Sequence, residues 1–323
     1  APVPGGAAMT ATRSWWDGRS RAPLRVGLAV AAALDLISLA GHLQTSSGRG
    51  GALPLAPGWL IAVGTHAAAI WIVAALGAGA LVCFALGRAP LRSAALALLA
   101  LGLLAESDAV LMGGPRRHVF AVGAVLLGWS IGVAWGRGLG GPEREDLAEA
   151  GALATLAATY FAAALSKLTA RGLDWTDDLT LRDLLLSQRR VSDHGLFASL
   201  AATIVAHPGI CRAMAVAALV VQLAAVLMLI SRSLRVLVGG LLFAFHFQVW
   251  LLTGILYMGN LRLLALLCVP WTRLPLLADL LAGLPAPGSP PLPDTVVQRR
   301  VALGALAITA AVVGAAWLVP SRG

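Results

Sequence analysis

The chain has 323 residues, of which 59% are hydrophobic and only 12% are charged, and its mean hydropathy is +0.83. This composition excludes an ordinary soluble globular protein. The net charge of +9 would suggest nucleic-acid binding in a soluble protein, but here the arginines lie between apolar runs. Arginines in such loops set topology and contact lipid headgroups, so we expect membrane lipid as a partner and no nucleic acid.

Apolar runs of membrane-spanning length, about 20 residues, recur along the whole chain. They predict an all-α fold, a polytopic transmembrane helix bundle with eight or nine helices. In chain order the predicted segments are 24–42, 59–87, 93–112, 118–136, 150–170, 213–231, 234–256, a short one at 258–272 interrupted by Asn260 and Arg262, and 301–319.

These segments define four regions of the chain. A basic N-terminal arm, 1–20, precedes a transmembrane domain over 21–273. A proline-rich linker, 274–300, leads to a C-terminal transmembrane helix over 301–319. We therefore expect no soluble domain beyond loops, the arm and the linker.

Loop charges predict the orientation of these segments. Four arginines lie at or before the start of the first segment: Arg13, Arg19, Arg21 and Arg25. The loop after the first segment holds only Arg49. Since positive loops face the cytoplasm, we expect a cytoplasmic N-terminus in a bacterial-type plasma membrane. The loop 171–212 would then lie outside despite its arginines, and its amphipathic stretch 181–200 predicts an interfacial helix.

With this orientation, ionisable residues at membrane depth gather in the external half of the protein. The residues that share this placement are Asp35, His42, His66, Glu106, Asp108, His118, Lys167 and His246. Polar residues with purely structural roles would not be expected to choose one side. The pattern predicts an enclosed polar site there, although a single histidine is more often a packing residue with satisfied hydrogen bonds.

Lys167 is the only lysine in the chain, against 23 arginines, and it lies near the end of an apolar segment. Arginine stays protonated in proteins, whereas a desolvated lysine can lose its proton and act as a base or nucleophile. Ionisable residues in membrane segments are costly and are functional candidates. The alternative is a lysine at a helix end whose ammonium reaches the interface.

Several chemistries are not indicated by the sequence. The six histidines lack the His-x-x-x-His and His-x-x-His-His spacings of membrane di-iron enzymes. The three cysteines are isolated in or beside apolar segments, as is typical of small core residues. No phosphate-binding loop and no Gly-x-Ser-x-Gly elbow is present. We predict no metal site.

The stretch Tyr160-Phe-Ala-Ala-Ala-Leu-Ser-Lys-Leu168, followed by Asp174-Trp175, resembles a signature of the vitamin K-dependent gamma-carboxylases. The membrane region of that family is called the horizontally transferred transmembrane (HTTM) domain. Four further matches follow the same order: Arg25-Val-Gly-Leu with Leu34-Asp35, Arg117-His118-Val-Phe, Phe245-His246-Phe-Gln with Thr253-Gly-Ile, and Val269-Pro-Trp271. The resemblance spans roughly residues 21–273.

This resemblance implies a mechanism. In the carboxylases, the lysine that Lys167 matches deprotonates a reduced naphthoquinone, which then reacts with oxygen and is epoxidised. The histidine matched by His118 assists. A reduced, menaquinone-like quinone and O2 are therefore the expected substrates, with Lys167 and His118 catalytic. The expected substrate-binding residues are His246, Asp35, His42, Tyr160 and Trp175.

The sequence also departs from the family pattern. Ala164 and Ser166 replace a glycine and a lysine of the signature, and Gln222 replaces an acidic residue. The family's large lumenal region has no counterpart before the chain ends, so protein carboxylation is not expected.

Two functions of different classes remain. One is an integral-membrane oxidoreductase that epoxidises a lipophilic quinol or phenol, an activity that could be coupled to a second substrate. The other is a non-redox HTTM accessory protein that binds a secreted peptide during its maturation or export. A transporter ranks third, because no inverted repeat is visible.

Overall fold

The computed structural model describes residues 22–46, 57–112, 120–188 and 195–269, and these contain helices and no strand. The chain divides into two compact units, with the boundary between Leu156 and Ala157. We call the described residues from 22 to 156 the N-terminal unit and those from 157 to 269 the C-terminal unit. The boundary falls inside one long helix, α6.

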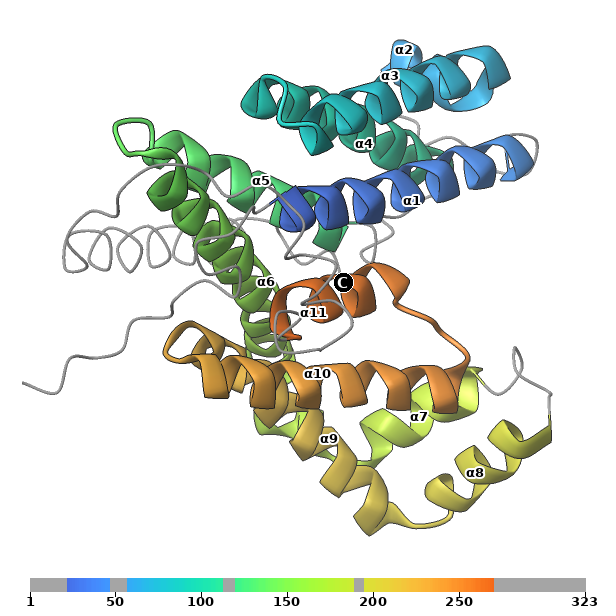
Figure 1. Ribbon diagram of the computed structural model, residues 1–323. Helices are drawn as coiled ribbons and strands as arrows, with labels where there is room; N and C mark the ends of the chain where they lie inside the picture. The colour runs from blue at the N-terminus through green and yellow to red at the C-terminus, as the bar shows by residue number, and fades with distance from the viewer. Residues whose placement is uncertain (1–21, 47–56, 113–119, 189–194, 270–323) are drawn as a thin grey trace, which may run out of the picture. The chain divides into compact units, whose positions relative to one another are not determined.

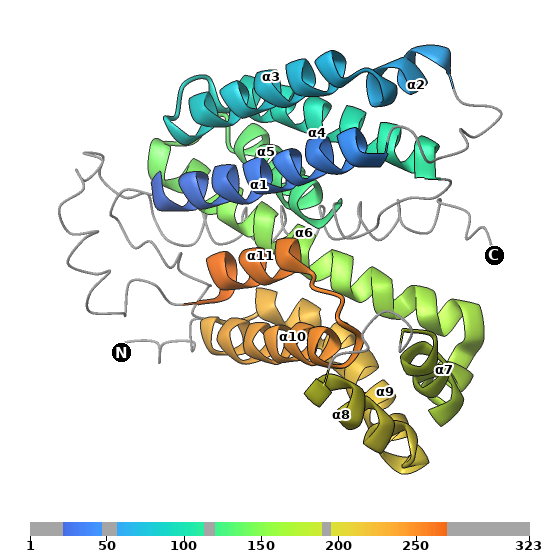
Figure 2. The same cartoon turned by 90° about the vertical axis from the view of Figure 1, so that its right-hand side faces the viewer.

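The N-terminal unit is built mainly from hydrophobic helices. They are α1 (Ala22–Ser46), α2 (Gly58–Thr65), α3 (Ala67–Ala85), α4 (Pro90–Met112), α5 (Phe120–Trp135) and the first half of α6 (Gly141–Arg171). Helices α1, α3 and α4 pack side by side (Figures 1 and 2). Gly77 on α3 permits this packing, since a Cβ there would lie 2.8 Å from both Leu36 of α1 and Ala100 of α4.

Helix α5 packs closely on the first half of α6 through glycines four residues apart. A Cβ at Gly128 would lie 2.5 Å from the carbonyl oxygen of Gly151, and one at Gly132 would lie 2.7 Å from the carbonyl carbon of Leu147. Small residues with this spacing let two membrane helices approach backbone to backbone. The Gly128-Trp-Ser-Ile-Gly132 sequence therefore fixes which face of α5 meets α6.

The C-terminal unit consists of the second half of α6 and seven shorter elements. They are η1 (Gly172–Thr176), α7 (Asp178–Gln188), α8 (Gly195–Val205), α9 (Pro208–Leu223), η2 (Ala224–Leu229), α10 (Arg232–Thr253) and α11 (Met258–Cys268). Helix α10 runs alongside α11, and α7 packs on α9 (Figure 2).

Local sequence signals define both ends of α10. The Ser231 hydroxyl accepts a hydrogen bond from the Leu234 backbone N–H at 3.2 Å, which caps the first turn. Gly254 ends the helix in the left-handed conformation with φ 71°, which costs glycine little. Gly239, in the middle of the helix, leaves room for Cys268 of α11. Gly239 therefore lets α10 and α11 approach closely.

Six helices in the described part of the chain are long and apolar enough to cross a membrane. The candidate spans are Pro23–Thr45, Ala67–Ala85, Pro90–Leu111, Glu143–Thr176, Pro208–Leu229 and Arg232–Thr253. The predicted segments 118–136 and 258–272 form the shorter apolar helices α5, of 16 residues, and α11, of 11 residues. The chain is thus an all-α, multi-pass membrane protein, as the composition predicted.

Some predicted regions fall outside the described residues, so the expected count of eight or nine helices stays a prediction. These regions are the arm 1–20, the linker 274–300 and the helix 301–319. Within the described residues, the predicted segment 59–87 is wrong as one helix. His66 adopts an extended backbone, with φ −92° and ψ 112°, and separates α2 from α3.

Helix α6 is longer than its predicted segment, 150–170. It begins at Gly141 and includes a turn with several acidic residues. Glu143 lies in the first turn, where a negative charge is stabilised by the helix dipole. Glu145 accepts a hydrogen bond from the Arg25 guanidinium of α1 within the N-terminal unit. Hydropathy predicts a loop for this charged stretch. These contacts explain why it forms the first turns of the helix instead.

Candidate functional site

Lys167 lies in the last two turns of α6, in the C-terminal unit, and its side chain is partly buried. Its Nζ donates a hydrogen bond to Gln222 Oε1 at 2.7 Å and a longer one to the Ala163 carbonyl oxygen at 3.2 Å. The Trp175 ring lies beside the amine, with Nζ 5.1 Å from the ring centroid. Two neutral acceptors and an aromatic face therefore surround the amine.

The helix geometry explains this placement. Side chains on an α-helix lean toward its N-terminus, so the lysine stem lies back over Ala163, one turn earlier. The chain turns through η1 directly after α6, and this turn returns Trp175 to the amine. Gln222 approaches from α9, where it is a buried polar residue with 5% of its surface exposed.

Among the described residues, the amine of Lys167 is held by neutral groups, without a carboxylate. In the part of the chain that the structure describes, Lys167 forms no ion pair. An ammonium bound only to neutral acceptors can release its proton without leaving an unpaired buried carboxylate behind. Gln222, which the sequence showed as a departure from the family's acidic residue, is the side chain that creates this neutral environment.

The Gln222→Glu variant is expected to slow acylation of Lys167 by a small N-hydroxysuccinimide ester at pH 8 by about tenfold or more. A carboxylate at this position pairs with the ammonium, and only the neutral amine reacts. Because Lys167 is the only lysine, peptide mass spectrometry reads its labelling directly.

Glutamate has nearly the size of glutamine, so access of the reagent to the amine stays the same in this variant. The two rates should therefore converge only at a pH high enough to deprotonate the amine in both proteins. Equal labelling of the two proteins at pH 8 would contradict the neutral environment that we assign to the amine.

A second polar cluster lies in the same unit and joins α6, α10 and α11. Tyr160 Oη and His246 Nε2 are 2.7 Å apart. Asn260 Nδ2 lies 3.2 Å from Tyr160 Oη and 3.3 Å from His246 Nε2. Tyr160 and His246 are almost fully buried, with 4% and 5% of their surfaces exposed. The structure therefore brings two predicted site residues into direct contact and adds Asn260 to them.

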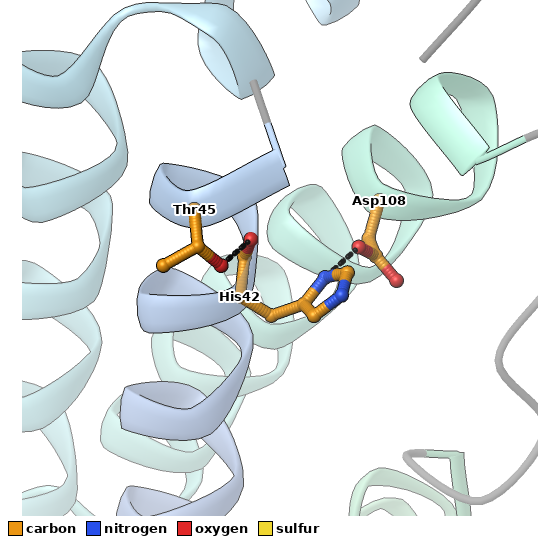
Figure 3. A network of polar contacts seen from close by, with 3 residues as sticks. All are labelled: His42, Thr45 and Asp108. Atoms are coloured by element: carbon orange, nitrogen blue, oxygen red, sulfur yellow. Dashed lines mark hydrogen bonds and ion pairs between the residues drawn. The ribbon is translucent and has the colours of Figure 1, made fainter. Parts of the chain in front are cut away.

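His42 and Asp35 belong to the N-terminal unit, on α1. Figure 3 shows the His42 ring facing Asp108 of α4, with Nδ1 2.8 Å from Oδ1, while Thr45 Oγ1 donates to the His42 carbonyl oxygen at 2.9 Å. Asp108 is completely buried, and the His42 side chain keeps 28% of its surface exposed. This pair links α1 to α4 near their ends, and Asp35 is partly buried two turns before His42.

Replacing His42 by alanine is expected to lower the stability of the protein by about 1–2 kcal/mol, because the buried Asp108 carboxylate loses a charge-assisted hydrogen bond. Thermal unfolding in detergent would record this as a lower midpoint. Thr45→Val is the matched control on the same turn. It removes an exposed hydroxyl and should change the stability by less than about 0.5 kcal/mol. If the unfolding midpoint falls equally in both variants, the His42–Asp108 hydrogen bond does not make the stabilising contribution that we expect.

Within the described residues, the contacts of five predicted site residues define three groups. Lys167 contacts Trp175, Tyr160 contacts His246, and His42 contacts Asp108 in the other unit. His118 lies outside the described residues. The expectation that Lys167, His118 and His246 line one cavity therefore stays a prediction.

Two residues that contact the predicted ones were missed as site residues. They are Gln222 and Asn260. Each is a polar residue in a mainly apolar segment. Such residues need hydrogen-bond partners inside a membrane, so this pattern could have identified them as site residues. In the sequence, Asn260 interrupts an otherwise apolar segment. Among the described residues, no three His, Cys, Asp or Glu side chains group as metal ligands.

We compared the chain with known protein families, curated proteins and solved structures. No protein-family model, no curated protein and no solved structure matches the chain. The fold and the site define an all-α, multi-pass membrane protein. Its C-terminal unit contains a lysine whose hydrogen-bond acceptors are neutral groups and a buried Tyr-His-Asn cluster. The resemblance to the carboxylase family stays a prediction from the sequence motifs.

Proposed function

We propose that this protein is an integral-membrane enzyme that oxygenates a lipophilic quinol or phenol to an epoxide, with Lys167 as the general base. The observation that supports the proposal best is the environment of the amine. Its hydrogen-bond acceptors are the neutral Gln222 side chain and the Ala163 carbonyl group, and Trp175 covers one side. Such an amine can take a proton from a weakly acidic hydroxyl group.

The proposed reaction starts with proton transfer from a quinol hydroxyl to the Lys167 amine. The resulting quinolate is electron-rich and reacts with O2. One oxygen atom enters the epoxide and the other leaves as water, so that quinol and O2 give quinone epoxide and water. The quinol loses four electrons and O2 gains four. The ammonium of Lys167 returns its proton to the reduced oxygen, which restores the base.

His118 has a proposed assisting role, which rests on its family match alone. The proposed location is the external half of a bacterial-type plasma membrane, with the N-terminus in the cytoplasm, and it rests on the loop charges. A site at membrane depth suits a substrate that partitions into lipid. Reduced menaquinone is the substrate with which we would begin, since it combines an acidic hydroxyl with a lipophilic chain.

The direct test is aerobic incubation of the purified protein in lipid nanodiscs with reduced menaquinone. We expect menaquinone epoxide by mass spectrometry, and with ¹⁸O2 one labelled oxygen atom in the epoxide. Oxidised menaquinone, anaerobic samples and empty nanodiscs are the controls. Epoxide formation no faster than in empty nanodiscs would refute the proposed activity on this substrate.

A further inference from the structure

The segment that follows α6 carries leucines that the described part of the protein leaves exposed. Four leucines of η1 and α7 have between 41% and 76% of their surfaces exposed: Leu173, Leu179, Leu184 and Leu186. Leu185, in contrast, is buried. We call the four exposed side chains the leucine surface. Large apolar side chains gathered on one segment indicate contact with a membrane or a partner, because leaving them in water is unfavourable.

Helix α7 lies beside helices that are long and apolar enough to cross a membrane. It packs on α9 and also contacts α10 within the C-terminal unit (Figure 2). Both helices belong to candidate spans, Pro208–Leu229 and Arg232–Thr253. The candidate span Glu143–Thr176 includes Leu173 and ends directly before α7. The leucine surface is therefore continuous with the membrane-spanning part of this unit, and lipid is the partner that this position favours.

Charged side chains on the same segment favour the edge of the membrane over its core. Asp174, Asp177, Arg182 and Asp183 are exposed among the leucines. Charged residues are costly in the hydrocarbon region of a bilayer. A helix in the interface combines apolar side chains that reach the acyl chains with charged side chains that stay in contact with water. The segment formed by η1 and α7 has this mixture.

The same segment contacts the Lys167 amine. Trp175 of η1 lies two residues after Leu173, and its ring centroid is 5.1 Å from Lys167 Nζ. Tryptophan is enriched at membrane interfaces, where its ring lies at the level of the headgroups. We propose that η1 and α7 lie in the membrane interface, with the leucine surface inserted among the lipids, and that they hold the Lys167 amine at this depth.

This placement restricts the kind of substrate that can react with the amine. The reacting hydroxyl group must come to the level of the lipid headgroups, while an apolar tail remains among the acyl chains. The substrate is then an amphiphile whose polar head lies at the interface. This extension rests on the proposed function, whereas the position of η1 and α7 does not depend on turnover.

Spin labels on single cysteines measure the depth of each labelled residue in lipid nanodiscs. Cys83 is exposed and is replaced by alanine, while Cys211 and Cys268 are buried and should take up no label. The reporters on the leucine surface are Leu179→Cys and Leu186→Cys. The measured quantity is the ratio of relaxation by O2, which concentrates in lipid, to relaxation by a water-soluble nickel complex.

Two further labels calibrate this ratio. Leu76→Cys lies on an exposed position in the middle of α3 and represents the hydrocarbon core. Gly138→Cys lies in the connection between α5 and α6, where a Cβ meets no atom within 4 Å, and represents water. We expect the ratios at Leu179 and Leu186 to lie between these two values. Ratios equal to either reference would overturn the proposal. Low accessibility to both reagents would also overturn it, because it would indicate cover by protein.

A label at Ser166→Cys reports the depth of the amine, because Ser166 is exposed and directly precedes Lys167. We expect an intermediate ratio here as well, and a ratio equal to that at Leu76 or Gly138 would refute the placement of the amine. These measurements use no substrate. Intermediate ratios without epoxide formation would therefore refute the proposed function alone, whereas epoxide formation with water-like ratios would refute the interface placement alone.

Discussion

Replacement of Lys167 by alanine is expected to reduce epoxide formation from reduced menaquinone by at least about a hundredfold, the lower end of what a general base contributes. Lys167→Arg should be nearly as damaging. A guanidinium keeps the positive charge but does not release its proton near pH 7, so it cannot act as a base. Single-turnover rates of the two variants and the wild-type protein in nanodiscs provide the measurement.

The Arg variant separates the two functions that the sequence left open. If the protein is a non-redox accessory factor for a secreted peptide, a positive charge near the end of α6 suffices, and Lys167→Arg should be tolerated. Full activity in that variant would exclude the general-base role. A His118→Ala variant should also impair the reaction, but a histidine that only orients the substrate leaves residual rate. Size-exclusion profiles in detergent confirm that each variant remains folded.

Replacement of Gly132 by alanine is expected to destabilise the N-terminal unit by about 1–3 kcal/mol, the range for overpacking. The new Cβ would lie 2.7 Å from the carbonyl carbon of Leu147 and 2.8 Å from the Cα of Ala148. Both atoms belong to the backbone of α6 and cannot rotate away, so the two helices must separate. Thermal unfolding in detergent should show a midpoint several degrees lower.

Gly123→Ala is the matched control in the same helix. The nearest heavy atom to a Cβ at Gly123 is Leu98 Cδ2 at 3.9 Å, an ordinary contact distance. Alanine also favours the helical backbone more than glycine, so this variant should be neutral or slightly stabilising. Equal midpoints for Gly132→Ala and Gly123→Ala would show that α5 and α6 do not approach as closely as we describe.

Hydropathy predicted where the membrane helices lie but was less successful at their ends. The segments that became α1, α4 and α10 were placed within a few residues. The start of α6 was missed by nine residues, since its first turns are charged and stabilised by the helix dipole and by Arg25 of another helix. The break at His66 was missed because both sides of it are equally apolar.

The sequence by itself determined the class of the protein and the residue with the most distinctive chemistry. Long apolar runs predict helices because a backbone in lipid must satisfy its own hydrogen bonds, and this requirement does not depend on neighbouring helices. The single lysine could be identified for a similar reason. The free-energy cost of an ionisable side chain in an apolar segment follows from that segment alone.

Only the tertiary structure decided which side chains meet. Lys167 and Gln222 are 55 residues apart, and Tyr160 and His246 are 86 apart. Such pairs depend on which faces of the helices pack together. Small residues contribute to that choice, as Gly132 does between α5 and α6 and Gly239 between α10 and α11, because their missing Cβ atoms allow close approach. A hydropathy pattern carries no information about this choice, because every apolar face is equally compatible with lipid and with another helix.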